Sequence, residues 1–178
     1  MAVSLSVSIS ACSEGNEESG YAIPASLCGV PVKSELLEPF LPPGDHVSTE
    51  RTFPDGRTER CTVTIDNRKV AIFTEQEWLS KTSRLLEVAP SSARRKAHGM
   101  TDRYLYSGIG AAGRTVGCTD PNQPDQRLFT IIQSFTPDRE DAPTMKKLIK
   151  AYTAQVERSK ACHPKRAVGP ASSESPKP

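Results

Sequence analysis

Cysteine offers the widest range of chemistry in this sequence, and the chain has five, at Cys12, Cys28, Cys61, Cys118 and Cys162. A zinc site needs closely spaced pairs such as C-x-x-C, which bring two thiolates to one ion. No two of these cysteines lie so close in the sequence, so we expect no metal site from them. Their chemistry is then that of free thiols, or that of one special cysteine and four paired ones.

The character of the sequence changes sharply at Cys12. Small and apolar residues precede it, and the acidic stretch SEGNEESG follows it. The tetrad at residues 9–12, Ile-Ser-Ala-Cys, resembles a bacterial lipobox, which implies that Cys12 receives diacylglycerol and that SEGNEESG is a flexible tether. A signal peptide also has a basic n-region, and no Lys or Arg precedes Cys12. Either the true start lies upstream, or Cys12 is an unmodified residue of an N-terminal arm.

The remaining four cysteines allow three disulfide pairings. We favour Cys28–Cys61 and Cys118–Cys162, because each bond would tie a helix-associated segment to a strand-associated one. On the chain-entropy account each bond contributes roughly 3.5–4 kcal/mol to stability. The reducing cytosol would not maintain such bonds, so the sequence predicts an extracytoplasmic location.

The stretch GIGAAG, residues 108–113, has the G-x-G-x-x-G spacing of a dinucleotide-binding loop. That motif holds a pyrophosphate only where a helix begins within it. The residues that follow, RTVGCTDPNQPD, include β-branched side chains and another glycine, and no amphipathic helix fits them. We therefore predict a junction between strands, where glycine permits a bulge or a positive φ, and no nucleotide cofactor.

Nucleophilic catalysis needs a base within reach, and the chain has three histidines, His46, His98 and His163. We expect all three to be exposed to solvent. Several aspartates, together with His46, could supply metal ligands, but their spacing matches neither a calcium loop nor a zinc site, and turn chemistry accounts for the aspartates. They are Asp45, Asp55, Asp120 and Asp125. The sequence thus predicts no catalytic, cofactor-binding or metal-binding residue.

Two further features have a functional and a structural interpretation. The basic cluster Arg94, Arg95 and Lys96 would meet anionic lipid headgroups or cell-wall polymers, or else lie in a solvated loop, which is the default. No aromatic residues alternate with it and the net charge is only +2, so no nucleic-acid partner is expected. Trp78 is the single tryptophan, and we expect it to anchor the core rather than to stack on a ligand.

Hydrophobic periodicity predicts the elements that would position these residues. Three segments favour helices, and the last of them has a continuous apolar stripe of Met145, Leu148, Ile149, Tyr152 and Val156. The predicted helices cover residues 33–38, 74–89 and 141–162. Alternating apolar residues predict strands at 61–65 and 70–73 around an Asp66-Asn67 turn, at 103–108 with an extension toward 114–118, and at 126–136. The last strand is apolar on both faces and is expected to be central.

This order of elements favours an α+β fold, with an antiparallel sheet of about four to five strands, helices packed on one face and two disulfides. We expect a lipobox-like segment and tether at residues 1–20, a globular domain at 21–163 and a disordered Pro/Ser-rich tail at 164–178. No apolar run is long enough to form a membrane-spanning helix.

The layout resembles that of small actinobacterial cell-envelope lipoproteins of uncharacterised function. A lipobox-like cysteine, an acidic tether, a helix-associated cysteine before the first strand cysteine, and a glycine-rich junction before a long C-terminal helix carry the resemblance, across residues 9–162. It implies a surface-anchored α+β domain. We expect a non-enzymatic extracytoplasmic protein, anchored to the membrane through a lipid on Cys12 or secreted, that binds an envelope protein or a small ligand. The alternative is an extracytoplasmic hydrolase whose site cannot be read from the sequence.

Overall fold

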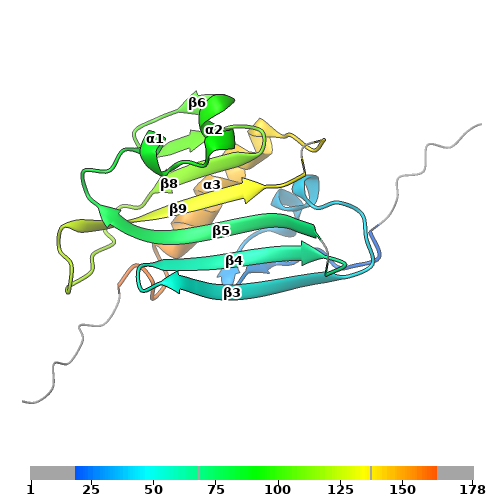
Figure 1. The fold of residues 1–178 in the computed structure, drawn as a ribbon, viewed down its shortest axis with the longest axis horizontal. Coiled ribbons are helices and arrows are strands. Elements are labelled where there is room, and N and C mark those ends of the chain that lie inside the picture. The colour runs from blue at the N-terminus through cyan, green and yellow to red at the C-terminus, as the bar shows by residue number, and fades with distance from the viewer. Residues whose placement is uncertain (1–18, 68, 137, 164–178) are drawn as a thin grey trace, which may run out of the picture.

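The computed structural model of the protein describes residues 19–67, 69–136 and 138–163. Its main element is an antiparallel sheet of seven strands in the order β3-β4-β5-β9-β8-β7-β6 (Figure 1). The strands are β3 Val47–Asp55, β4 Thr58–Ile65, β5 Lys69–Ser80, β6 Gly99–Met100, β7 Tyr104–Tyr106, β8 Gly110–Arg114 and β9 Gln126–Ser134. The predicted α+β class is confirmed, whereas the predicted number of four to five strands is too small.

The additional strands have sequences without clear periodicity. Strand β3 forms an edge of the sheet, and most of its side chains are exposed, so its sequence needs no apolar alternation. Strand β6 has only two residues. The strand predicted over residues 103–108 with its extension is two strands, because the chain reverses at 107–109 to pair β7 with β8.

The predicted hairpin around residues 66–67 is confirmed as β4 and β5. Cys61, Val63 and Ile65 are buried on one face of β4. Asp66 and Asn67 both have φ of 53°, a left-handed conformation that tight hairpin turns require and that Asp and Asn tolerate. The hairpin therefore follows from turn chemistry and alternation alone.

The helix predicted over residues 74–89 is wrong for most of its length. Strand β5 continues to Ser80, and a helix, α1, covers only Leu85–Val88. Thr74 and Gln76 are polar but buried on the same face of β5. Buried and exposed residues therefore alternate along the strand, although apolar and polar residues do not. The apolar residues with apparent helical spacing belong to two elements, because Trp78 and Leu79 end a strand whereas Leu85 and Leu86 lie in a separate short helix.

The long C-terminal helix, α3, covers Ala142–Val156, and all five residues of its predicted apolar stripe are buried. It packs against β7, β8 and β9. The Asp141 side chain caps its first turn by accepting a hydrogen bond from the Thr144 backbone N–H at 2.8 Å. Strand β9 lies fourth of seven, as predicted, with Ile132 buried on the α3 side and Phe129 buried on the other.

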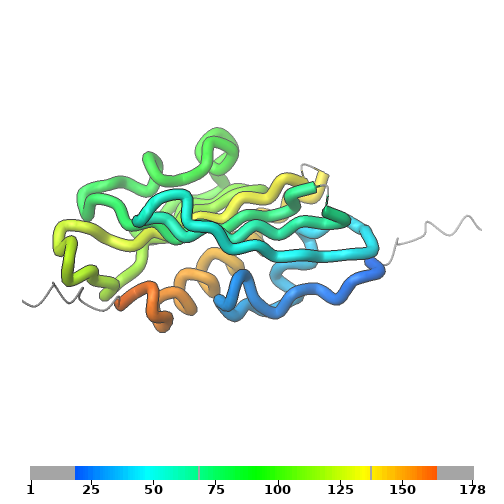
Figure 2. Tube along the Cα trace, turned by 60° about the horizontal axis from the view of Figure 1, so that its bottom comes forward, coloured from blue at the N-terminus to red at the C-terminus, as the bar shows by residue number. Residues whose placement is uncertain are grey.

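Helices cover both faces of the sheet, which corrects the prediction that they pack on one. Helices α1 and α2, the latter Ser91–Arg95, lie on the face opposite α3 (Figures 1 and 2). There Ala93 packs in a second core cluster with Leu105 and Phe129. Short helices of four and five residues leave little periodicity in the sequence, which is why α2 was not expected.

The N-terminal segment lies beside α3 on its face of the sheet (Figure 2). It contains a small hairpin of β1 Ser26–Leu27 and β2 Val30–Pro31, followed by two 3-10 turns, η1 Ser34–Leu36 and η2 Glu38–Phe40. The α-helix predicted over residues 33–38 is therefore two 3-10 turns. Pro39 lies in the first turn of η2, and its missing N–H prevents one continuous ladder of helical hydrogen bonds.

Candidate functional site

Both predicted disulfides are present, with Cα–Cα distances of 5.7 Å for Cys28–Cys61 and 4.5 Å for Cys118–Cys162. The first joins the turn of the N-terminal hairpin to β4, and the second joins the segment after β8 to the segment after α3. Because Cys162 is bonded, it is no nucleophile. Two disulfides indicate an oxidising compartment. Cys12, the predicted lipidation site, lies outside the described residues, as do 1–18 of the predicted 1–20 segment and all of the predicted tail.

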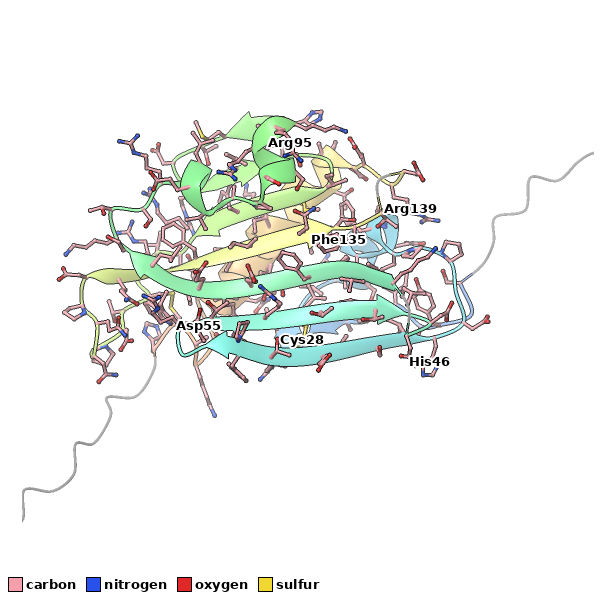
Figure 3. The ribbon with its side chains drawn as sticks, viewed as in Figure 1. Cys28, His46, Asp55, Arg95, Phe135 and Arg139 are labelled. Atoms are coloured by element: carbon pink, nitrogen blue, oxygen red, sulfur yellow. A yellow bond between two sulfur atoms is a disulfide. The ribbon has the colours of Figure 1, made fainter. Side chains whose placement is uncertain are left out.

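The three histidines are far from forming a common site. His46 precedes β3, and the turn residue Asp55 ends this strand, so the two lie at opposite ends of it (Figure 3). His98 precedes β6, and His163 follows α3. All three are exposed, as predicted. In the described ranges none of their imidazoles makes a hydrogen bond or an ion pair.

The aspartates take part in turns and surface pairs. The Asp55 carboxylate accepts a hydrogen bond from the Arg57 N–H at 2.8 Å, and this bond lowers its pKa. Asp120 accepts from the Asn122 N–H at 2.8 Å. Asp125 pairs with Lys81 at 2.5 Å, and the hydrogen bond from Lys81 lowers the pKa of Asp125. Within residues 19–67, 69–136 and 138–163, no three His, Cys, Asp or Glu side chains gather as metal ligands would.

The glycine-rich stretch joins two strands, as predicted. The Ser107 N–H donates to the Gly110 carbonyl at 2.8 Å, closing the turn between β7 and β8. Gly113 lies on β8 against α3, where a Cβ atom would meet the Thr130 hydroxyl at 2.6 Å. Glycine here allows a strand to pack closely against a helix. A nucleotide-binding loop would begin a helix in this stretch, but residues 110–114 form strand β8 instead.

The basic cluster is only partly free. Lys96 pairs with Glu140 at 2.7 Å, and the Arg94 guanidinium donates to the Leu86 carbonyl at 3.4 Å. Arg95 is exposed at the end of α2 (Figure 3). Arg95 is therefore the only cation of the cluster without a partner among the described residues. A single free cation is a weaker site for an anionic lipid or polymer than a concentrated basic patch would be.

The best candidate site is a pocket of about 320 Å³ where β7 meets α3. Alternate residues of a strand share a face, so Tyr104 and Tyr106 both point toward the helix side. Residues four apart share one flank of a helix, so Lys146 and Lys150 both face the pocket. The turn of residues 101–103 forms its remaining wall. We refer to this site as the tyrosine–lysine pocket.

Cations and rings are paired within the tyrosine–lysine pocket. The Lys146 ammonium lies 5.5 Å from the Tyr106 ring centroid, and the Arg103 guanidinium lies 5.2 Å from that of Tyr104. Arg103 is held by Glu157 at 2.6 Å. Gly99 on β6 leaves room for the Tyr106 hydroxyl, which would lie 2.5 Å from a Cβ at that position. The rings are thus fixed by neighbours rather than free at the surface.

The electrostatics of this pocket favour an anion. Burial raises the pKa of Tyr104 above its ordinary value of 10.0, so the lining gains no negative charge from this side chain. Among the described residues neither Lys146 nor Lys150 has a carboxylate partner. The lining contains one acidic residue, Asp102, against three basic ones, Arg103, Lys146 and Lys150. Two rings and two ammonium groups can hold a ligand that has a flat apolar part and a negative charge.

A second hollow, of about 290 Å³, lies on the other side of the same turn. Its lining includes Leu86 and Met100, which are 46% and 60% exposed. These two side chains add exposed apolar surface beside the tyrosine–lysine pocket.

Sequence reasoning missed the tyrosine–lysine pocket altogether. The only local signals are the alternation in RYLY and the spacing of the two lysines on the polar flank of α3. Both signals are common on ordinary strands and helices. Tyr106 and Lys146 lie forty positions apart in the chain, so only the packing of α3 against β7 brings them together.

Comparison of the chain with protein-family models, curated proteins and solved structures found no match. The described helices include none that is long and apolar enough to cross a membrane.

Proposed function

We propose that this protein is a non-enzymatic binding domain of the cell envelope, anchored to the membrane through a lipid on Cys12 or secreted. Its layout resembles small actinobacterial envelope lipoproteins, and its two disulfides support a location outside the cytoplasm. The observation that carries the binding function is the tyrosine–lysine pocket, which combines fixed aromatic rings with two ammonium groups that have no carboxylate partner among the described residues.

The ligand of this pocket is a small anion with a flat apolar part, or an envelope protein that presents such a group. The neighbouring hollow with Leu86 and Met100 would extend the contact to a protein partner. The hydrolase alternative needs a base beside a nucleophile, and in the described ranges no imidazole hydrogen-bonds a hydroxyl.

The pocket is tested by NMR titration of the purified protein with phenyl phosphate and with neutral phenol. We expect phenyl phosphate to shift the resonances of Tyr104 and Tyr106 and to bind more tightly than phenol. Lys146→Gln should weaken its binding about threefold to tenfold, and added salt should do the same, because the charges are partly exposed. Lys147→Gln is the matched control, since Lys147 does not line the pocket. Equal weakening by both variants would contradict a specific site.

The location is tested by non-reducing mass spectrometry on protein from its native cells, with the membrane fraction kept separate. We expect recovery from membranes, a mature N-terminus at diacylglyceryl-modified Cys12 and four oxidised cysteines. A soluble product that retains Met1 and carries free thiols would refute the envelope proposal.

A further inference from the structure

The hollow of about 290 Å³ beyond the turn of residues 101–103 lies on the face of the sheet that α1 and α2 cover (Figure 1). Strand alternation and register establish this position. A Cβ atom on Gly113 would face α3, so Arg114, the next residue of β8, lies on the opposite face. Met100 of β6 is paired with Leu105, which belongs to the core cluster on that same face. We call this hollow the Arg114 pocket.

Arg114 is the unusual residue of this pocket. It is partly buried on β8, and its cross-strand neighbour is the buried Phe129. Among the described residues its guanidinium has no hydrogen-bond or ion-pair partner. Its nitrogen atoms are nevertheless accessible, because they are not among the fully buried polar atoms that lack a partner in this part of the chain. A cation taken partly out of water without a partner carries a desolvation cost, which a bound anion would offset.

A second guanidinium lines the same pocket. Arg84 lies just before α1, and the Glu87 carboxylate accepts a hydrogen bond from its backbone N–H at 2.9 Å. In the described ranges the Arg84 guanidinium has no carboxylate partner. The third cation of the lining, Lys81, is paired with Asp125 at 2.5 Å. The lining has one acidic residue, Asp102, against two guanidinium groups without a carboxylate partner, so the balance of charge favours an anion. A guanidinium fits a carboxylate with two parallel hydrogen bonds.

The apolar walls of the Arg114 pocket are aliphatic. Leu85 is buried, whereas Leu86 and Met100 are largely exposed. None of the described residues that line it is aromatic, in contrast to the tyrosine–lysine pocket. Such walls offer contact to a flexible chain rather than a surface on which a flat ring stacks. A volume of about 290 Å³ is near the lower end for small-molecule pockets, so the chain is short.

We propose that the Arg114 pocket binds a carboxylate on a short aliphatic chain. The carboxylate lies against the guanidinium groups of Arg84 and Arg114, and the chain lies against Leu86 and Met100. Two sources present this chemistry: a fatty acid, and the C-terminus of a partner peptide whose last residue is aliphatic. The two pockets share only the turn residues at 101 and 102, so this site holds whether or not the tyrosine–lysine pocket binds its proposed ligand.

The test compares hexanoate with hexanol, which has a chain of the same length but no charge. The probe is NMR of methyl-labelled methionine: Met100 lines the pocket, whereas Met145 is buried in the core on the α3 side and serves as the internal control. We expect hexanoate to shift the Met100 methyl resonance with a Kd of roughly millimolar order, and hexanol to bind about tenfold or more weakly. N-acetyl-leucine separates the two sources. Binding of both carboxylates supports a peptide C-terminus, and binding of hexanoate alone supports a fatty acid.

Arg114→Gln should weaken hexanoate binding about tenfold, because the carboxylate loses a charged partner. Arg127→Gln is the matched control: Arg127 is also partly buried and without an ion pair in the described ranges, and it lies on the neighbouring strand β9, but it does not line the pocket. Lys146→Gln should leave hexanoate binding unchanged while it weakens phenyl phosphate binding, so failure of one proposal is distinguished from failure of the other.

The proposal is overturned if hexanol binds as tightly as hexanoate, if neither probe shifts the Met100 resonance, or if Arg114→Gln and Arg127→Gln bind hexanoate equally well. The comparison of the two probes needs only the wild-type protein, so it stands even if a variant fails to fold.

Discussion

Tyr152 shows how a single buried polar residue is placed in this core. It is 1% exposed, and its hydroxyl lies between Thr74 and Gln76. Burial disfavours the phenolate and raises its pKa to about 12, although the hydrogen bonds from Thr74 and Gln76 act in the opposite direction. The residue lies on the apolar stripe of α3 and brings a polar group into the centre of the α3 face.

The raised pKa makes stability depend on pH at the alkaline end. In the unfolded chain Tyr152 ionises near its ordinary value of 10.0, whereas in the folded protein it stays neutral to about 12. The stabilisation is therefore complete below pH 10 and is lost as the pH rises toward 12, by about 2–3 kcal/mol in all. We expect urea unfolding from about pH 8 to about pH 11 to show the wild type losing stability faster than Tyr152→Phe. Tyr106→Phe serves as the control, and a Tyr152→Phe protein with the wild-type slope would contradict the assignment.

Helix α3 contributes both to the tyrosine–lysine pocket and to the core. Its flank supplies Lys146 and Lys150 to the pocket, and its buried stripe supplies the Tyr152 hydroxyl that accepts a hydrogen bond from Gln76. Its N-terminus is fixed by the Asp141 cap, which satisfies a backbone N–H that has no partner within the helix.

Asp141→Ala should lower the free energy of unfolding by about 1 kcal/mol, because the Thr144 N–H loses its acceptor. The exposed residue Asp138, just before this helix, provides the control, and Asp138→Ala should change stability by less than about 0.5 kcal/mol. Thermal or urea unfolding of the two variants checks the difference. Equal effects would mean that charge near the helix, rather than the cap, is responsible.

At the scale of the whole molecule, two disulfides tie peripheral segments of the described domain to its body. One connects the N-terminal hairpin to β4 across a separation of 33 residues, and the other connects the segment after α3 to the segment after β8 across 44. Both sulfur atoms of the second bond belong to buried residues. Only 36% of the residues of the chain are hydrophobic, so we expect such bonds to contribute a large share of its stability.

The double variant Cys118→Ser/Cys162→Ser should be less stable than the wild type by about 2–5 kcal/mol, since the unfolded chain regains the freedom that the bond removes. Urea unfolding under non-reducing conditions measures the loss, and the Cys28–Cys61 bond remains as an internal reference. Reducing agent should destabilise the wild type more than this variant. Unchanged stability in the double variant would show that the bond is dispensable.

The features that could be predicted from the sequence are those whose physical cause is local or covalent. Alternation and the Asp66-Asn67 turn predicted the β4–β5 hairpin, the apolar stripe predicted the buried face of α3, and the apolar run of residues 126–136 predicted a central strand. The disulfide pairing was also predicted, since each bond ties segments from different elements. The role of Cys12 stays a prediction, as it lies outside the described residues.

The features that depend on which elements become neighbours could not be predicted without the folded structure. An edge strand needs no alternation of apolar residues, so the sequence did not predict β3. The continuation of β5 was not predicted either, because the buried residues there are the polar Thr74 and Gln76. The choice of face for α1 and α2 depends on sheet order, which periodicity does not encode. The tyrosine–lysine pocket joins residues from distant parts of the chain, such as Tyr106 and Lys146. Their side chains form one site only when α3 packs against the sheet.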